Sequence, residues 1–259
     1  MIIGIDHIAF SSSNPAVPID FLRSLGYRIT ITGMQIDNLD IKQPFLQRAD
    51  RLHDLILLEK QGSFSIEILN HGYVSQANDY IFPVFENTPS NISDFVSSTQ
   101  LDGATLEKAR LKTLEKEIFI QPCHETDEFR FNKVVITTAM MERSRFFWES
   151  FGLKSSISRA DYCLLKFDSP LDQTSYIMHL VAKDRGDFQP SLDARSFNSI
   201  AFLSTSVLKE KQFLDERGLD VTEVQRLVVG ENELEICFAA GPTGELVEIV
   251  GLHNQQHSR

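Results

Sequence analysis

A strand-like segment followed by a helix-like segment recurs three times along this chain at a fixed spacing. The strand-like segments are rich in Ile, Val and Phe, and each helix-like segment ends at a Gly. The three pairs are IDHIAF with FLRSLGY (5–10 and 21–27), FNKVVI with FWESFGL (131–136 and 147–153), and FNSIAF with FLDERGL (197–202 and 213–219). The step from His7 to Phe21, from Lys133 to Phe147 and from Ser199 to Phe213 is 14 residues in each case. Such a repeat predicts several copies of one supersecondary unit.

Each copy has the pattern of a βαβββ unit and therefore predicts an α+β fold. The Gly that closes each helix-like segment is typical of a helix that ends in a left-handed conformation. Three further strand-like segments follow it. In the first copy they are Tyr27–Thr32, Asp54–Leu58 and Phe64–Leu69, and in the last they are Val221–Val229, Leu234–Ala239 and Glu245–Val250. One such unit cannot bury both faces of its sheet, so we expect the units to pair into curved, cup-like mixed sheets with helices outside.

The segment Asp79–Cys123 is interpreted as a degenerate second copy, which makes four modules in all. Its expected elements are a strand at Tyr80–Phe85, a helix at Ile92–Ser98 and a closing strand at Glu117–Gln121. Four modules are preferred because three would leave one unpaired. The predicted halves are residues 1–124 and 129–252, joined by a polar linker. Residues 253–259 are expected to form a flexible tail in which His253 and His257 are solvent-exposed.

Charge and composition exclude several classes of protein. A formal net charge of −11 disfavours binding to nucleic acid. No apolar segment approaches the ~20 residues of a membrane span, and no signal peptide is indicated. Three scattered cysteines predict neither a disulfide framework nor a structural zinc site. We therefore expect a cytoplasmic protein, monomeric or homodimeric, that does not bind membranes and whose partner is a small molecule.

Two motifs make the chain resemble the vicinal oxygen chelate superfamily. They are the DHIAF start of the first strand and the closing strands IEIL (66–69) and VEIV (247–250), the latter behind a Gly-Pro-Thr-Gly turn. That superfamily includes glyoxalase I, extradiol dioxygenases, and fosfomycin and bleomycin resistance proteins. The resemblance implies that metal ligands come from the third residue of each opening strand and from the Glu of each closing strand.

These two positions have diverged among the four copies. They hold His7 and Glu67 in the first copy, Tyr80 or Ile81 and Phe119 in the second, Lys133 and His179 in the third, and Ser199 and Glu248 in the fourth. Strand alternation places His7 on one face with Ile5 and Ala9, which supports an inward direction for its ring. Imidazole and carboxylate suit a borderline divalent ion, whereas Lys, Ser and Phe are not usual ligands.

The pairing of the modules determines which residues share a cup. If the first module pairs with the fourth, as in four-module glyoxalase I enzymes, the metal ligands are His7, Glu67 and Glu248, with Ser199 beside them. If neighbouring modules pair, a second cup gathers Lys133, His179, Glu248 and Ser199 instead. The two-His-one-Glu set of extradiol dioxygenases would need His at positions 133 and 199, so this sequence departs from it.

Two functions are compatible with these positions. The first is a glyoxalase-like enzyme, of isomerase, lyase or oxygenase type, that uses a divalent ion (Fe, Mn, Ni, Co or Zn) to bind an oxygen-chelating substrate. In it, Glu248 is the expected base and Ser199 a hydrogen-bond donor to the substrate. The alternative is a metal-free protein that binds a small molecule or sequesters an antibiotic. The polar connection Gly33–Arg51 is expected to be either a lid over the cup or a plain surface loop.

Overall fold

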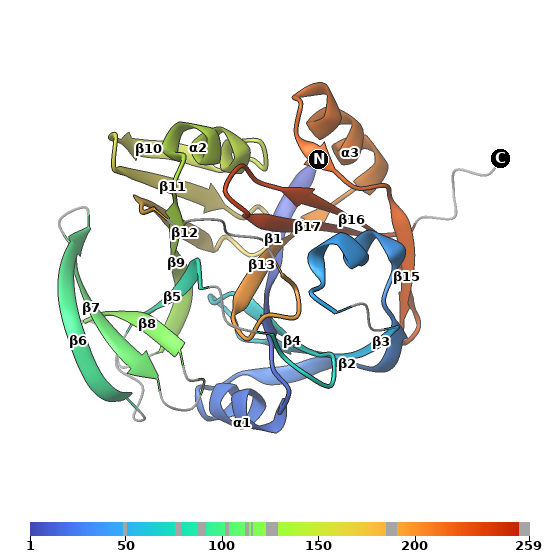
Figure 1. Ribbon diagram of the computed structural model, residues 1–259, viewed down its shortest axis with the longest axis horizontal. Coiled ribbons are helices and arrows are strands. Elements are labelled where there is room, and N and C mark those ends of the chain that lie inside the picture. The colour runs from blue at the N-terminus through green and yellow to red at the C-terminus, as the bar shows by residue number, and fades with distance from the viewer. Residues whose placement is uncertain are drawn as a thin grey trace.

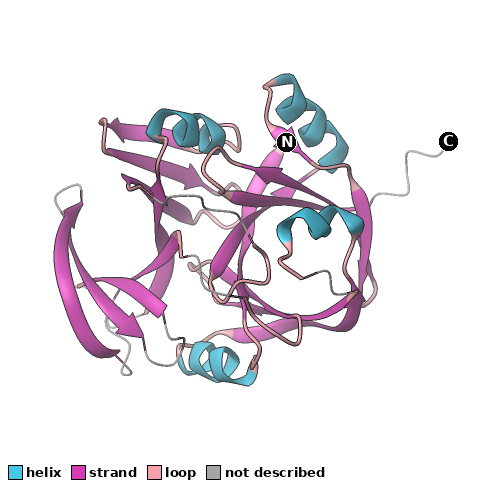
Figure 2. Cartoon of the chain, in the orientation of Figure 1, coloured by secondary structure: helices cyan, strands magenta, loops and turns pink. Residues whose placement is uncertain are grey.

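The computed structural model is built mainly of strands, with a few short helices on its outside (Figure 2). It describes residues 1–48, 51–75, 79–86, 92–101, 104–111, 114, 116–122, 129–184 and 191–253, and only the backbone of 92–96 and 104. In chain order the elements are β1 (Ile2–Ser11), α1 (Ala16–Ser24), β2 (Arg28–Asp37), η1 (Asp40–Phe45, a 3-10 helix), β3 (Leu52–Glu59), β4 (Ser65–Asn70), β5 (Ile81–Glu86), β6 (Ile92–Leu101), β7 (Ala104–Leu111), β8 (Lys116–Gln121), β9 (Arg130–Thr138), α2 (Met141–Glu149), β10 (Lys154–Ser158), β11 (Tyr162–Asp168), β12 (Ser175–Ala182), β13 (Phe197–Ser204), α3 (Val207–Glu216), β14 (Asp220–Val221), β15 (Gln225–Val229), β16 (Asn232–Ala240) and β17 (Leu246–Leu252).

The strands form groups with a common pairing pattern. In each group the opening strand runs parallel to the closing strand, and the strands between them add on as an antiparallel meander. The parallel pairs are β1 with β4, β5 with β8, β9 with β12 and β13 with β17. The mixed sheets and helices confirm the predicted α+β class.

The three predicted helix segments lie where the repeat placed them. Helices α1, α2 and α3 each follow an opening strand and lie on the outside of the molecule (Figure 1). The glycines that end them, Gly26, Gly152 and Gly218, have φ values of 91°, 90° and 76°. Only glycine adopts this conformation without strain, so each helix ends at the Gly that closes its helix-like segment in the sequence.

The opening strands bury one face against the helices and turn the other toward a concave surface. Ile8 and Phe10 of β1 belong to the large core cluster together with Phe21 and Leu22 of α1. Ala9, between them in sequence, belongs to a different cluster on the concave side. His7 and Ala9 therefore lie on the inner face, as predicted. Ile5, which was expected on the same face, instead packs against the large core cluster, because the pairing of β1 with β13 is irregular between Ile5 and His7.

The first group pairs with the fourth, and the second with the third. Strand β1 is antiparallel to β13, with His7 opposite Ala201 and Ala9 opposite Ser199. Strand β5 is likewise antiparallel to β9. The order is that of the glyoxalase I alternative, so Glu248 is brought to His7 rather than to Lys133.

The helix predicted at Ile92–Ser98 is wrong. The segment belongs to strand β6, which pairs with β7 at the edge of the molecule (Figure 1). Its sequence, ISDFVSSTQL, is rich in Ser and β-branched residues, which favour extended backbone over helix. The helix was expected by analogy with the other three copies, but the local composition determines the structure.

The C-terminal end also differs from expectation at one residue. The ring of His253 forms an ion pair or hydrogen bond with Glu235, at 2.9 Å, and its side chain is only 13% exposed. His253 is therefore not a free surface residue, because β17 carries it alongside β16. Residues 254–259, including His257, and the predicted linker lie outside the described residues. None of the described helices is long and apolar enough to cross a membrane.

Candidate metal centre

Three side chains from three strands meet on the concave face of the paired first and fourth groups. They are His7 of β1, Glu67 of β4 and Glu248 of β17, and one ligand atom of each lies within 4.8 Å of the other two. Strand register explains the meeting, because Ala201 lies opposite His7 across one strand pair and beside Glu248 across the next. Glu67 is brought in by the parallel pairing of β4 with β1, where it lies beside Ala9.

The His7 ring is held in one tautomer by its neighbour in sequence. Nδ1 of His7 lies 2.8 Å from Oδ2 of Asp6, and a carboxylate can only accept, so Nδ1 is the donor. Nε2 points to the two other carboxylates, 3.3 Å from Glu67 and 3.6 Å from Glu248. Among the described residues, this buried atom has no hydrogen-bond partner. It therefore presents either a lone pair or a proton to two carboxylates.

The protonation equilibria of the three groups are linked. Burial alone would lower the pKa of His7, but the charge of Glu67, the hydrogen bond with Asp6 and the nearby carboxylate of Glu248 raise it well above 6.5. Burial alone would raise the pKa of Glu67, yet the positive charge of a protonated His7, together with that of Lys42, lowers it to about 2. The geometry thus attracts positive charge, whether it comes from a proton or a cation.

The three side chains lie in an apolar cavity of about 240 Å³. Its walls are alternate residues of the surrounding strands, which follows from the period-two geometry of each strand. They include Leu55, Leu57, Leu227, Val229, Ile236 and Val250. A cavity with apolar walls and a few converging polar groups is typical of a small-molecule site.

Two residues of this cavity were missed in the sequence. Lys42, on η1, and His53, on β3, both line it and are only 5% and 2% exposed. Burial, with the nearby Lys42 and His71, lowers the pKa of His53 to about 3, so its ring is neutral at neutral pH. His53 alternates with Leu55 and Leu57 on β3, a signal that a strand boundary set at Asp54 excluded.

The connection after β2 covers part of the cavity and is anchored by a buried carboxylate. Phe45 of η1 packs on Phe238 of β16, with ring centroids 5.7 Å apart. Asp193, which is fully buried, accepts hydrogen bonds from the backbone amides of Gln47 and Arg48, at 3.0 and 3.1 Å to Oδ2. The connection is thus packed against the cavity walls, as a lid would be, although residues 49 and 50 lie outside the described part.

Replacing Asp193 by Ala is expected to loosen this connection. Burial would raise the pKa of Asp193, but hydrogen bonds from Ser191, Tyr73 and the two amides lower it, so the carboxylate stabilises the fold. We expect Asp193→Ala to lower the free energy of unfolding by about 2–4 kcal/mol. Because the pKa of Asp193 is depressed in the folded state, the difference in stability between wild type and Asp193→Ala should be full above pH ~4. It should decrease as the pH falls further.

Chemical denaturation at pH 7 and pH 3 measures both effects. Asp20→Ala is the matched control, because Asp20 is exposed on α1. An Asp193→Ala protein as stable as this control at pH 7 would contradict the anchoring role.

The other residues singled out in the sequence do not join this group. Ser199 is 1% exposed, lies opposite Ala9 and is absent from the residues that line the cavity. Its hydroxyl is buried and has no hydrogen-bond partner among the described residues, so its expected role as a donor to the substrate stays a prediction. Lys133 forms a 2.5 Å ion pair with Glu86, and His179 Nδ1 lies 2.9 Å from the hydroxyl of Tyr162.

The alternative second cup therefore gathers no ligand set within the described residues. Lys133 is neutralised by Glu86, and Glu248 lies with His7 instead. Of the second copy, the hydroxyl of Tyr80 donates to the carbonyl of Asn198 at 2.7 Å, which is a structural contact. Ile81 is buried in the core, and Phe119 packs on Phe82.

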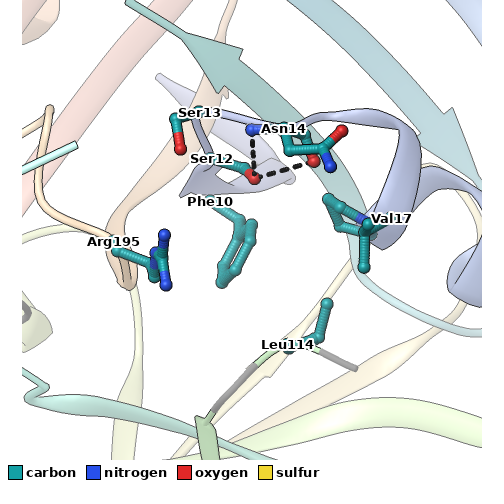
Figure 3. A pocket seen from close by; sticks show the side chains of 8 residues that line it. Phe10, Ser12, Ser13, Asn14, Val17, Leu114 and Arg195 are labelled. Carbon is teal, nitrogen blue, oxygen red and sulfur yellow. Dashed lines mark hydrogen bonds between the residues drawn. The ribbon is translucent and has the colours of Figure 1, made fainter. Parts of the chain in front are cut away.

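A separate hollow of about 180 Å³ lies at the start of α1 (Figure 3). Phe10, Asn14, Val17 and Arg195 are among its lining residues. The hydroxyl of Ser12 donates to the carbonyl of Asn14 and accepts from its amide, so it serves the turn that precedes α1. Within the part of the chain that the structure describes, this hollow offers no group of ligand side chains comparable to the three at His7.

The donor set fits a divalent ion. It consists of one imidazole nitrogen and two carboxylates, whose two negative charges match one divalent cation. The other nitrogen of the imidazole donates a hydrogen bond to the carboxylate of Asp6. A carboxylate that orients a ligating histidine is the usual outer partner in such sites. His7, Glu67 and Glu248 would hold the ion, and Asp6 would orient the imidazole.

Solved structures of vicinal oxygen chelate proteins share the fold over nearly the whole chain. A protein from Bacillus subtilis with a proposed dioxygenase activity matches with a TM-score of 0.66 at 14% identity, over 98% of this chain and 86% of its own. Glyoxalase I from Zea mays matches with a TM-score of 0.62 at 12% identity, over 96% and 92%. A point variant of the maize enzyme gives 0.65 at 14% identity, over the same fractions. No family model matches the chain, and no curated protein matches it either.

Proposed function

We propose that this chain, which has the vicinal oxygen chelate fold, is a divalent-metal-dependent enzyme that acts on a small oxygen-chelating substrate. The observation that carries this proposal is the buried Nε2 of His7, which faces Glu67 and Glu248 and has no hydrogen-bond partner among the described residues. Two buried carboxylates that converge without a cation would be costly, so the arrangement favours a bound positive charge.

A bound divalent ion would supply Lewis acidity toward vicinal oxygens of the substrate. The residues of the chain then have separate tasks. Asp6 holds the His7 ring, and Glu67, whose pKa is about 2, remains anionic at any working pH. Glu248 is the farther of the two carboxylates from Nε2, at 3.6 Å, and is our candidate for moving a proton of the substrate.

An isomerase or lyase type of reaction is favoured over an oxygenase type. Non-haem iron oxygenases commonly use two His and one carboxylate. Here the set is one His and two carboxylates, and the opening-strand position of the fourth group holds Ser199 in place of a second His. A second carboxylate suits proton transfer beside a Lewis acid better than it suits oxygen activation.

The metal-free alternative rests on the raised pKa of His7. A protonated ring could neutralise Glu67 without any ion, and the cavity could then hold an apolar ligand as a binding protein does. The two proposals differ in what the purified protein retains.

Elemental analysis and reconstitution test the enzyme proposal. The wild-type protein should retain about one Fe, Mn, Ni, Co or Zn per chain after gel filtration, and chelation should abolish its turnover of small compounds that carry vicinal oxygens. Restoring the ion should restore turnover. Absence of metal after exposure to all five ions would support the binding alternative instead.

Replacing Asp6 by Asn is expected to weaken metal binding without removing a ligand. The change removes the charge that fixes Nδ1 as donor, and outer partners of this kind are worth about 10- to 100-fold in affinity. Metal titration with a competing chelator measures the effect. Glu59→Gln is the matched control, since Glu59 lines the same cavity but is exposed. Equal weakening by both variants would show a general charge effect rather than orientation of His7.

We also propose that the second strand group is a copy of the module without its helix. Its strands β5 to β8 pair as those of the other three groups do. With that copy, residues 1–124 and 129–252 would each hold two modules, as the sequence predicts.

A further inference from the structure

We infer that His53 accepts a hydrogen bond from the substrate and that the substrate is an uncharged aliphatic compound with a hydroxyl group. The inference rests on the proposed function for the vicinal oxygens of the substrate, but hydrogen bonding by His53 can be measured without any metal. It begins from a buried imidazole in the cavity wall, whose Nδ1 has no hydrogen-bond partner among the described residues.

The ring of His53 is buried and neutral. The residue is 2% exposed and lines the cavity together with the three candidate ligands. Burial is the main cause that lowers its pKa to about 3, and the nearby Lys42 and His71 add to the effect. A neutral imidazole has one N–H and one lone pair. The ring therefore needs one acceptor and one donor to be fully hydrogen-bonded.

The fold supplies the acceptor. His53 of β3 lies opposite Ile36 of β2, and a hydrogen bond with the backbone of Ile36 offsets part of the lowering of its pKa. A hydrogen bond that raises the pKa of an imidazole is one that the ring donates, so its partner is the carbonyl of Ile36. A carbonyl has no proton to give, so this contact satisfies the N–H and not the lone pair.

A β-bulge holds the carbonyl of Ile36 at this position. The pairing of β2 with β3 is irregular between Gly33 and Ile36, and Gln35 in this stretch has a φ of 55°. The Oδ1 of Asp54 accepts from the amide of Gln35 at 2.9 Å and so stabilises the bulge. A Cβ added at Gly33 would lie 2.3 Å from Cδ1 of Ile36, so the close packing here requires Gly. Bulges are common beside active sites, where they change the direction of a side chain.

No donor for the lone pair is present in the described part of the chain. Nδ1 of His53 is buried and has no hydrogen-bond partner there. Lys42 acts on the ring through its charge. His71 is stacked on the face of the ring, with centroids 5.4 Å apart, and a lone pair in the ring plane does not point to a stacked ring. A buried acceptor without a donor is costly, so a donor group of the ligand completes the site.

The charges in the cavity disfavour an anionic ligand. Its charged lining residues are four carboxylates, one ammonium and the His7 ring, namely Asp6, Glu59, Glu67, Glu248, Lys42 and His7. With His7 protonated, the four negative charges exceed the two positive charges by two. With a divalent ion in place of that proton, the excess of negative charge is one. The cavity is therefore negative in both states, and a ligand anion would be repelled.

A ligand cation would find no buried carboxylate available to it. Glu67 and Glu248 both face Nε2 of His7, and Asp6 accepts from Nδ1 of the same ring. Glu59 is exposed, so solvent screens its charge. The remaining walls are mainly leucine, isoleucine and valine side chains. One unsatisfied acceptor in such walls suits an uncharged aliphatic compound that carries a hydroxyl donor.

Calorimetric titration of the chelated protein with 5-hydroxyoctan-4-one and with octane-4,5-dione tests the inference. The two probes share a carbon skeleton and vicinal oxygens, and only the first has a hydroxyl group. Wild type should bind the hydroxyketone about 5- to 100-fold more tightly than the dione, because the dione leaves a buried acceptor without a donor. His53→Phe keeps a ring without an acceptor and should lose this preference. His53→Gln supplies a carbonyl oxygen and should keep part of it.

Two controls accompany this titration. His179→Phe changes another buried histidine, which contacts Tyr162 and does not line the cavity, so it should behave as wild type. Circular dichroism on the same samples checks that each variant is folded. 2-Hydroxyoctanoate tests the charge of the ligand, and wild type should bind it about 10-fold or more weakly than the hydroxyketone.

Three results would overturn the inference. They are a wild type with no preference for the hydroxyketone, a preference that persists in His53→Phe, and equal or tighter binding of 2-hydroxyoctanoate. Metal content separates the inference from the proposed function, since His53 is not among the candidate ligands and His53→Phe should retain as much metal as wild type. A preference that depends on His53 in a protein that binds no metal would support the inference and overturn the enzyme proposal.

Discussion

His7→Ala and Glu67→Ala are each expected to lose at least 100-fold in metal affinity and, with it, all metal-dependent turnover. Each change removes one of three protein ligands, and even an outer-shell partner is worth about 10- to 100-fold. Both side chains face the cavity rather than the large core cluster, so thermal unfolding should remain cooperative. Metal per chain after gel filtration and circular dichroism on the same samples measure the two effects.

His179→Ala is the matched control for these variants. His179 occupies the closing-strand position of the third group, and its ring contacts Tyr162 instead of the three candidate ligands. It should retain the metal content of wild type. Stoichiometric metal in both His7→Ala and Glu67→Ala would contradict the assignment, as would its loss in His179→Ala alone.

Metal affinity is expected to rise about tenfold per pH unit between roughly pH 5.5 and 7. The pKa of His7 in the metal-free protein is raised well above 6.5, since Glu67, Asp6 and Glu248 together outweigh burial. A ligating imidazole must be neutral, so binding releases one proton below that pKa. Glu67 stays ionised over this range because its pKa is about 2. Competition titrations at several pH values measure the slope, and Asp6→Asn should flatten it near pH 7.

The same pKa shift predicts how the metal-free protein depends on pH. A raised folded pKa means that the stability due to the His7 proton is full below pH ~6.5 and is lost as pH rises through the folded pKa. Chelated protein should therefore become less stable with rising pH, while metal-loaded protein should not. A metal affinity that does not vary from pH 5.5 to 7 would contradict a protonated His7 in the metal-free state.

The repeat predicted the fold well because it records local structure. The helix-ending glycines, the opening strands and the inward face of His7 depend on residues close together in the sequence. The candidate ligand pair His7 and Glu67 follows from the positions that the family resemblance implied, which lie on the parallel strands β1 and β4. The partner of that pair, Glu248, could not be chosen from the sequence, because the choice depends on the long-range pairing of β1 with β13.

The parts that the sequence did not predict depend on contacts between distant segments. Lys42 lies in an irregular connection whose course is determined by Asp193 and by Phe238. The sequence around Lys42 shows no strand or helix periodicity from which the direction of its side chain could be predicted. The prediction of a helix at Ile92–Ser98 was wrong for a different reason. It relied on the analogy with the other copies, although the local composition favours a strand.

Anomalous diffraction from crystals of the metal-loaded protein tests the central claim most directly. Crystals grown with cobalt or zinc should show one strong anomalous peak bounded by His7 Nε2, Glu67 and Glu248. Its distances to the three ligand atoms should be near the ~2.0–2.2 Å typical of nitrogen and oxygen ligands. A peak at another group of side chains, or a His7 ring that contacts Glu67 directly with no peak between them, would contradict the account.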